Sequence, residues 1–567
     1  IAQFWHSYID ALIKLGRFND AKALLTQAKA KGATGKPFAV LSKSIGLLEK
    51  AYKAKVQRCK KLFNDGSFQK IITISESLIR SYPNLFEPYI LCASAYHALD
   101  NNDCALDNYK QAIKLKPDFA EAFNSMGTIL ASKSDFDGAV DSYRQAIKIN
   151  PDYAEAYDNL GIALLDKGAF GAALSNYKTL LKLRPYYAEA HNNMGNTLRA
   201  LGYFNEALQS YKKAIKIKPS DALVYNNMGI TFSHQCERRL AIDSFKRAIA
   251  IRPDFPLAEY NLGDELLKDQ NFVSGFQGLE YRWKTRDNLG TYLVTSKPAW
   301  AGEFGQTVFV WGEQGIGDEI MFSSLIPELH SMCSKLIVQC DERLIPLYQR
   351  SFPEDIIYKS IRGDVAEDSY DFHIPIGSLA GKFRTSLESF SKTSRGYLVP
   401  DKTKTSQLRQ NLLEGGAKTL IGISWNTASP LRHANNRNIA LADLAQALSS
   451  PEVQLVCLQY GDVSHEIDTL KKEFGIDVLR VSEIDKRNDI DGLASLIMAC
   501  DKIVSTTNAT VHLAGALGAD VKVLLPFSAR WIWGTKGSQS TWYDTVTPYW
   551  QDVEGDWRNI LNSVKLL

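Results

Sequence analysis

The sequence predicts an α-solenoid in the first half of the chain and two α/β lobes in the second half. Three observations predict this fold class. Prolines recur every 34 residues from Pro83 to Pro253, and glycines recur with the same period from Gly127 to Gly263. After about residue 300 the period stops, and short apolar runs typical of strands alternate with longer runs typical of helices.

The composition excludes several classes of protein. The chain has 567 residues, too many for one ordinary core, and its 45% hydrophobic and 23% charged residues suit a soluble globular protein. The 66 Lys and Arg residues nearly balance the 63 Asp and Glu residues, so no nucleic-acid partner is expected. No apolar run has the length of a membrane span, and the N-terminal residues do not have the pattern of a signal peptide.

The eight cysteines are scattered, and none forms a C-x-x-C pair. This spacing predicts neither a zinc site nor a disulfide framework. A reducing, cytoplasmic location is therefore expected, with no metal and no cofactor.

The 34-residue units of the first half each predict two helices. A typical unit, residues 151–184, reads PDYAEAYDNLGIALLDKGAFGAALSNYKTLLKLR. Proline ends one unit and begins the next, and small residues let the two helices approach each other. We expect the array to span 1–290, with degenerate repeats over 1–82, regular repeats over 83–263 and a capping segment to about 290.

One residue per unit stands two positions before the repeated glycine. In order along the chain, these residues are Ser125, Asn159, Asn193, Asn227 and Asn261. A fixed phase places them in a ladder along one face, and an amide can both donate to and accept from a peptide backbone. The sequence leaves two roles open: the ladder binds a peptide, or it only caps and solvates the inner face.

The 34-residue pattern resembles the tetratricopeptide repeat. The resemblance implies a superhelix whose concave face holds a protein or peptide acceptor, and self-association through the repeats is a further expectation. An asparagine at the matching phase binds peptide in protein O-GlcNAc transferases, which this array resembles.

The second half predicts two blocks of alternating strands and helices. The first lobe is expected over 291–400, a linker over 401–417 and the second lobe over 418–567. The predicted strands cover 307–311, 335–340, 355–359, 370–375, 419–425, 453–460, 477–482, 502–507 and 521–526. The predicted helices cover 318–331, 342–351, 441–448, 464–474, 490–499 and 510–517. Ligands of such lobes bind beyond the carboxyl ends of the strands.

The first strand-to-helix loop lies in WGEQGIGDEIMF, residues 311–322. Gly315 and Gly317 fit the start of a dinucleotide fingerprint, but Ile320 stands where the third glycine would be, so an NAD site is weakly supported. The glycines bring backbone N–H groups near a ligand, and Asp318 lies at a helix start. From this loop alone, the sequence favours an ordinary helix cap over an anion-site or catalytic role for Asp318.

Two loops of the second lobe carry polar side chains at strand ends. The loop 424–441 contains Asn426, Arg432 and Arg437, and arginine forks match phosphate oxygens. The loop 505–518 places Thr507 and Asn508 before a helix start, which predicts an anion site. His512 in that helix is either a site residue or a buried structural histidine. Aromatic residues over 524–551 either stack on a ligand or pack the C-terminal segment.

The second half resembles the heptosyltransferase-like glycosyltransferases of the GT-B fold, with two Rossmann-like lobes. The matching pieces are EQGIGDEIMF, GISW with RNIAL, LQYGD, the run from Asp489 to Gly518, and LLPFSARWIWG. Repeats followed by such a domain also resemble protein O-GlcNAc transferase and bacterial repeat proteins that carry a glycosyltransferase domain.

The resemblance implies a role for each matching residue. Asp318 matches the general base, with His512 as the alternative, and Arg437 matches a contact to the donor diphosphate. Gln459 and Gly461 match the loop near the donor ribose and base. The diphosphate turn is matched by Thr507, Asn508, Ala509 and His512. Gly315, Gly317, Asn426 and Arg432 complete the expected nucleotide-sugar site.

The chain departs from that family at Thr507 and Asn508, where heptosyltransferases usually have Asp-Thr, so the donor is not expected to be ADP-heptose by default. The resemblance implies an inverting, metal-independent transfer of a sugar to a protein hydroxyl. Two alternatives stay open. One is a repeat scaffold with a degenerate, inactive domain, and the other is a glycosyltransferase that acts on a glycan or a lipid.

Overall fold

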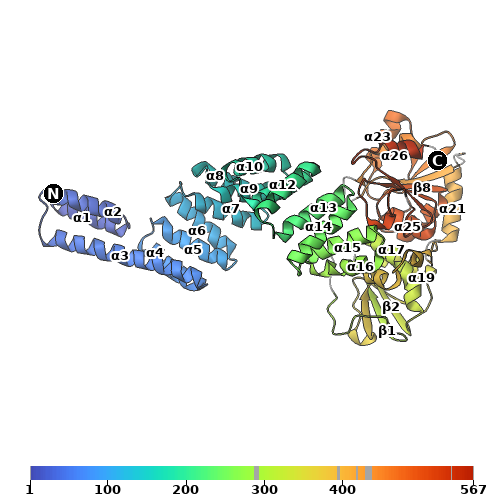
Figure 1. Ribbon diagram of the computed structural model, residues 1–567, viewed down its shortest axis with the longest axis horizontal. Helices are drawn as coiled ribbons and strands as arrows, with labels where there is room; N and C mark the ends of the chain where they lie inside the picture. The colour runs from blue at the N-terminus through green and yellow to red at the C-terminus, as the bar shows by residue number, and fades with distance from the viewer. Residues whose placement is uncertain are drawn as a thin grey trace. The chain divides into compact units, whose positions relative to one another are not determined.

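The computed structural model describes residues 2–285, 293–313, 315–392, 396–414, 416, 419–427, 437–537 and 539–565. The chain divides into two units, Ile1–Ser220 and Asp221–Leu567, and each is described by itself (Figure 1).

The first unit consists of paired antiparallel helices. Their bounds are α1 Ala2–Lys14, α2 Phe18–Ala30, α3 Lys36–Asn64, α4 Phe68–Ser81, α5 Phe86–Ala98, α6 Asn102–Leu115, α7 Ala120–Ser132, α8 Phe136–Ile149, α9 Ala154–Asp166, α10 Phe170–Leu183, α11 Ala188–Ala200 and α12 Phe204–Ile217. From α5 onward the helices alternate between 13 and 14 residues, as a 34-residue repeat requires. The degenerate start differs, because α3 is a single helix of 29 residues.

The repeated glycines make room for an aromatic ring of the partner helix. A Cβ atom on Gly161 would lie 2.3 Å from the Tyr177 ring, and one on Gly195 would lie 2.4 Å from the Tyr211 ring. Both rings are fully buried. The glycine and the aromatic residue sixteen positions later therefore form one packing unit that each repeat reuses.

The second unit begins with two more helix pairs. Their bounds are α13 Ala222–His234, α14 Arg238–Ile251, α15 Pro256–Lys268 and α16 Phe272–Leu279, followed by the 3-10 helix η1 Glu280–Lys284. Arg282 of η1 donates through Nε and Nη2 to the two carboxylate oxygens of buried Glu313, at 2.8 and 2.9 Å. This paired, buried ion pair joins the last repeat to the end of the first strand.

Two parallel sheets follow. The first has the strand order β3-β2-β1-β4, and the second has the order β10-β9-β8-β5-β6-β7. The strand bounds are β1 Thr307–Trp311, β2 Lys335–Cys340, β3 Ile357–Ser360, β4 Phe372–Pro375, β5 Thr419–Ser424, β6 Val453–Cys457, β7 Val478–Leu479, β8 Lys502–Thr506, β9 Val521–Leu525 and β10 Val546–Trp550. Every strand pairing is parallel, so the carboxyl ends of each sheet share one edge.

Helices connect these strands. They are α17 Ile316–Phe322, α18 Ile326–His330, α19 Ile345–Ser351, α20 Leu379–Phe383, α21 Lys402–Leu413, α22 Leu441–Leu448, α23 Ser464–Phe474, α24 Ile490–Ala499, α25 Ala509–Leu517 and α26 Arg558–Val564. The predicted strands and helices of the second half coincide with these elements to within a few residues. The predicted linker at 401–417 is different: it contains α21, which Asp401 caps by accepting from the Lys404 N–H. The strand β10 and the helices α20 and α26 are not among the predicted elements.

One apolar core runs through the second unit. It contains Leu267, Phe272 and Phe276 of the last repeat together with buried side chains of both sheets and their helices. Phe276 lies edge-on to Trp531, with 5.4 Å between ring centroids. The last helix pair is therefore packed as part of the α/β region.

Candidate functional site

The strand order reverses at one point in each sheet. In the first sheet β2 and β4 lie on opposite sides of β1, and in the second sheet β6 and β8 lie on opposite sides of β5. The loops at such switch points are where doubly wound sheets bind ligands. The loops that follow β1, β5 and β8 hold Asp318, Arg437 and Thr507, so the sequence-predicted residues occupy these positions.

The helix α17, which follows β1 of the first sheet, packs against α25, which follows β8 of the second sheet (Figure 1). A Cβ atom on Gly317 would lie 3.2 Å from Cδ2 of His512 and 3.6 Å from Cα of Ala509. Glycine at 317 therefore permits this close approach. The opening glycine motif brings the predicted loop of the first lobe against the predicted turn of the second. Gly315 precedes it as the N-cap of α17, with open space around its Cα.

Asp318 is paired with an arginine of the second lobe. Arg530 Nη1 donates to Asp318 Oδ1 at 2.9 Å, and the Asp318 side chain is 20% exposed. The Asp318 charge raises the pKa of Arg530 above its ordinary value. Asp318 is thus not the helix cap, because Gly315 is the N-cap of α17 and no side chain caps it. The Asp318 carboxylate instead links the two lobes through Arg530.

His512 lies buried beside this ion pair. Its Nδ1 is 3.1 Å from the Tyr543 hydroxyl, and its ring lies 5.2 Å from that of Trp533. Burial lowers the pKa of His512 to about 4, although the nearby Asp318 charge opposes the shift. The imidazole is therefore neutral near pH 7 and can accept a proton only weakly.

Arg437 is the cation of this region with no counter-ion among the described residues. Burial lowers its pKa, the Arg530 charge lowers it further, and the Asp318 charge acts in the opposite direction. The Asp318 charge thus acts on both guanidinium groups, and the charge of Asp264 acts on Arg530 as well. Arg432, the other predicted arginine, lies outside the described residues.

The start of α25 combines a structural amide with unsatisfied hydroxyls. The Asn508 side chain accepts from the Thr510 N–H at 3.0 Å and donates to Ser424 Oγ at 2.7 Å. Its amide is therefore used to cap α25 and to fix β8 to β5. The hydroxyls of Thr506, Thr507 and Thr510 are buried and have no hydrogen-bond partner among the described residues.

Gln459 braces the ends of β5 and β6. Its Oε1 accepts from the Ser424 hydroxyl and from the N–H groups of Trp425 and Asn426, at 2.9 to 3.0 Å. Its Nε2 donates to the Asn426 carbonyl at 3.1 Å. The Gln459 side chain is fully occupied within the protein, so its position near a predicted ligand comes from the fold of the loop and not from a free amide.

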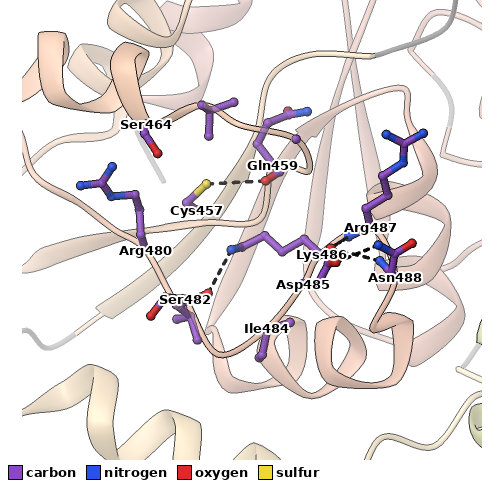
Figure 2. Close-up of a pocket in the computed structure, with 13 residues that line it drawn as sticks. Cys457, Gln459, Ser464, Arg480, Ser482, Ile484, Asp485, Lys486, Arg487 and Asn488 are labelled. Atoms are coloured by element: carbon purple, nitrogen blue, oxygen red, sulfur yellow. Dashed lines mark hydrogen bonds between the residues drawn. The ribbon is translucent and has the colours of Figure 1, made fainter.

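A cavity of about 670 Å³ opens at the carboxyl ends of β6 and β7. Gln459 and Gly461 line one side, and the segment from Arg480 to Asn488 lines the other (Figure 2). Gly461 has a φ of +89°, which glycine adopts without strain. Lys486 extends along the hollow and donates to the Val481 carbonyl at 3.2 Å (Figure 2). The volume suits a nucleoside.

The last helix pair of the repeats borders the group formed by Asp318, Arg437, His512 and Arg530, here called the cluster. Tyr260 of α15 is close enough for the charges of Arg530 and Asp318 to act on its pKa, which burial raises. Two turns further along α15, Lys268 lines a second cavity of about 320 Å³ together with Arg238, Trp550 and Gln551. Arg238 Nε, Trp550 Nε1 and Gln551 Nε2 are buried donors without a described partner.

The predicted asparagine ladder links neighbouring repeats. In the first unit, Asn159 Nδ2 donates to Asn124 Oδ1 at 3.0 Å, and Asn193 Nδ2 donates to Asp158 Oδ1 at 3.1 Å. In the second unit, Asn261 Nδ2 donates in the same way to Asn226 Oδ1, and Asn227 is buried. The amide donors of Asn159, Asn193 and Asn261 thus clamp one repeat to the next, which is neither of the two expected roles.

Sequence reasoning missed Arg530, Tyr543 and Tyr260. Arg530 had a usable signal, because it is the only charged residue in LLPFSARWIWG. Tyr543 and Tyr260 had none, since a tyrosine in an aromatic-rich segment or a repeat helix is usually a packing residue.

In the part of the chain that the structure describes, no helix combines the length and apolar character needed to cross a bilayer. Nor do three or more His, Cys, Asp or Glu side chains gather there as ligands of a metal ion would.

A family model matches the repeats of this chain, and one curated protein matches about half of its length. The family model described as TPR repeat matches residues 93–133, 127–168, 163–202 and 195–235. The protein FlbA of Caulobacter vibrioides is 28% identical over 284 residues, which are 47% of this chain and 47% of FlbA. The chain thus matches about half the length of that curated relative.

Two solved structures are similar to part of this chain. YrrB, a TPR protein described as having an unusual peptide-binding site, is 24% identical and covers 32% of this chain and 95% of its own, with a TM-score of 0.29. MamA is 24% identical and covers 30% of this chain and 92% of its own, with a TM-score of 0.28. By the family match, residues 93–235 of this chain are tetratricopeptide repeats.

Proposed function

We propose that the protein is a glycosyltransferase that moves a sugar from a nucleotide-activated donor to a hydroxyl group of a protein acceptor. One observation carries the proposal: among the described residues Arg437 has no counter-ion of its own beside the Asp318–Arg530 pair, at the switch points of two parallel sheets. A half-buried cation next to a second cation is stabilised by an anionic ligand. The diphosphate of a nucleotide sugar is such a ligand.

The start of α25 supports the same assignment. The helix has nine residues, and its first N–H groups carry the positive end of the helix dipole. Three threonine hydroxyls without a partner among the described residues lie at this turn. Small rotations would let these groups donate to phosphate oxygens, while Asn508 keeps the turn in place. The cavity beside Gln459 and Gly461 would then hold the nucleoside.

The reaction is a displacement at the anomeric carbon. The acceptor oxygen forms the new bond to that carbon as the bond to the diphosphate breaks, and the electron pair leaves with the diphosphate. Arg437 and the α25 turn would stabilise the charge on the leaving group. Asp318 would take the acceptor proton, and Arg530 would hold its carboxylate in place. Attack opposite to the leaving group inverts the anomeric configuration, and no step requires a metal ion.

The position of α15 favours a protein acceptor. Tyr260 lies in α15 within range of the Asp318 and Arg530 charges, so a chain that lies along α15 would arrive at Asp318. The unsatisfied donors of the second cavity suit backbone carbonyl groups. A glycan or a lipid acceptor would not need these repeats.

The test separates donor binding from chemistry. Thermal unfolding is measured with UDP, GDP, ADP and CMP, and sugar transfer is followed by mass spectrometry of acceptor proteins. Asp318→Asn should keep the nucleotide-dependent rise in Tm and lose transfer by about 10²-fold or more. Arg437→Gln should reduce the rise in Tm itself.

Arg362→Gln is the matched control, because Arg362 is an exposed arginine outside the cluster. Transfer at the wild-type rate by Asp318→Asn would remove Asp318 as the base and leave His512 to be tested by His512→Gln. If no nucleotide raises Tm while peptides still bind to the repeats, the inactive scaffold is the correct function. The occupied side chains of Gln459 and Asn508 are the observation that favours that alternative.

A further inference from the structure

A groove on the first unit is unrelated to the candidate site. It lies among α10, α11 and α12, with a volume of about 720 Å³. Its floor is formed by Leu181, Met194 and Ile217. Its charged rim consists of four exposed lysines, which are Lys178 and Lys182 of α10 and Lys213 and Lys216 of α12. No acidic side chain lines the groove, and none of the four lysines forms an ion pair with a described residue.

Beside this groove, two positions that are aspartate in the preceding repeats hold other residues. In earlier repeats Lys110 pairs with Asp107 and Arg144 pairs with Asp141, each at 3.8 Å. The residue at the position of Asp107 and Asp141 in α10 is Ser175, so Lys178 has lost the partner that its phase provides elsewhere. The fold does not require this loss, because both sequences form the same helix.

The second departure exposes an aromatic ring. Asp118 and Asp152 follow the proline of the two preceding repeats, and Tyr186 stands at their position. Its side chain is 86% exposed and borders both the groove and a neighbouring hollow of about 470 Å³. An exposed tyrosine with apolar hollows on both sides is typical of a binding anchor and not of a packing residue.

A third feature indicates the backbone chemistry of the partner. His191, which lines the groove, has its Nε2 2.9 Å from the Pro185 carbonyl, so Nε2 is the donor and Nδ1 is left as an acceptor. This buried Nδ1 has no partner among the described residues. A polypeptide backbone offers N–H donors that such an acceptor can bind, whereas a phosphate group by itself does not.

We propose that this groove, defined by Tyr186, His191 and the four lysines, binds an acidic polypeptide segment that carries apolar side chains. The apolar side chains would lie on Leu181, Met194 and Ile217, with Tyr186 against them. The carboxylates would pair with lysines of α10 on one side and α12 on the other. The ladder asparagines do not line this groove. The groove would recruit its partner whether or not the protein transfers a sugar.

The test measures binding of a fluorescein-labelled 14-residue peptide to the full chain. The peptide has Leu at every third or fourth position and Glu between. Fluorescence anisotropy should show binding that weakens at least tenfold when Gln replaces Glu in the peptide. Tyr186→Asp should weaken binding at least tenfold, and Ser175→Asp by severalfold. Both variants restore the aspartate of the two preceding repeats, so they are expected to fold.

Gln111→Asp adds the same charge to an exposed position of α6 and should leave binding unchanged. Three results would overturn the proposal. They are no binding of the acidic peptide, unchanged binding by Tyr186→Asp, and tighter binding of a 14-nucleotide single-stranded DNA or of phosphatidylserine vesicles than of the peptide.

Discussion

Asp318 and Glu319 are neighbours in sequence with opposite environments. Asp318 is partly exposed and paired with Arg530, whereas Glu319 is 1% exposed and accepts from the Asp341 N–H at 2.9 Å. Burial raises the pKa of Glu319 from 4.5 to about 7, and the charge of Asp341 adds to the shift. The chain thus places one carboxylate toward the site and the next one into the core behind it.

This burial gives a pH dependence of stability with a defined sign. Folded Glu319 binds its proton more tightly than unfolded Glu319, so folding is favoured less as pH rises from about 4.5 to about 7. Glu319→Gln removes that titration and keeps an acceptor for the Asp341 N–H. The difference in Tm between the variant and the wild type, measured by circular dichroism, should grow from pH 5 to pH 8 in favour of the variant. A difference that stays constant with pH would contradict the assignment.

At the scale of elements, each repeat is held by a glycine and a buried ring. Gly195 of α11 and Tyr211 of α12 illustrate the arrangement, because Tyr211 is also fixed by a hydrogen bond from its hydroxyl to Asn196 Oδ1 at 2.8 Å. The ring therefore has no free direction in which to move when a methyl group is added at position 195.

Gly195→Ala is predicted to destabilise the repeats by about 1–3 kcal/mol, because overpacking outweighs the better helix propensity of alanine. Gly171→Ala is the matched control: Gly171 lies in α10, with open space around its Cα, and alanine there should stabilise by up to about 1 kcal/mol. Urea unfolding of the full chain, followed by helical circular dichroism, distinguishes the two. Equal effects of both substitutions would show that the ring is not a constraint.

At the scale of the whole molecule, the packing boundary does not follow the repeat boundary. The sequence places the end of the array near residue 290, but the core of the α/β region includes Phe272 and Phe276 of the last repeat. The Arg282–Glu313 pair binds the same segment to the first sheet. The division into units falls instead after Ser220.

Two truncated chains test this boundary. A fragment of residues 221–567 should fold with one cooperative thermal transition, since it keeps the whole core. A fragment of residues 291–567 removes Phe276 from Trp531 and leaves Glu313 buried without Arg282, so it should aggregate or unfold at a much lower temperature. Size-exclusion chromatography and calorimetry measure both. Equal stability of the two fragments would place the boundary at 290.

The sequence alone determined the periodic features. The 34-residue spacing of Pro and Gly shows the repeats, because each unit must reuse the same turn and the same close contact. Runs such as 441–448, 464–474 and 490–499 predict their helices to the residue, since apolar periodicity and local caps act over short distances.

Only the tertiary structure decided which polar side chains are free. Asn508, Gln459 and the ladder asparagines have the residue types of a binding site, yet their amides are used to fix strands and repeats. Arg530 comes to Asp318 from 212 positions away in sequence. A hydrogen bond between distant segments depends on how the sheets pack, and no local pattern records it. The role of a side chain is therefore fixed by its partners, whereas the presence of a helix is fixed by its own residues.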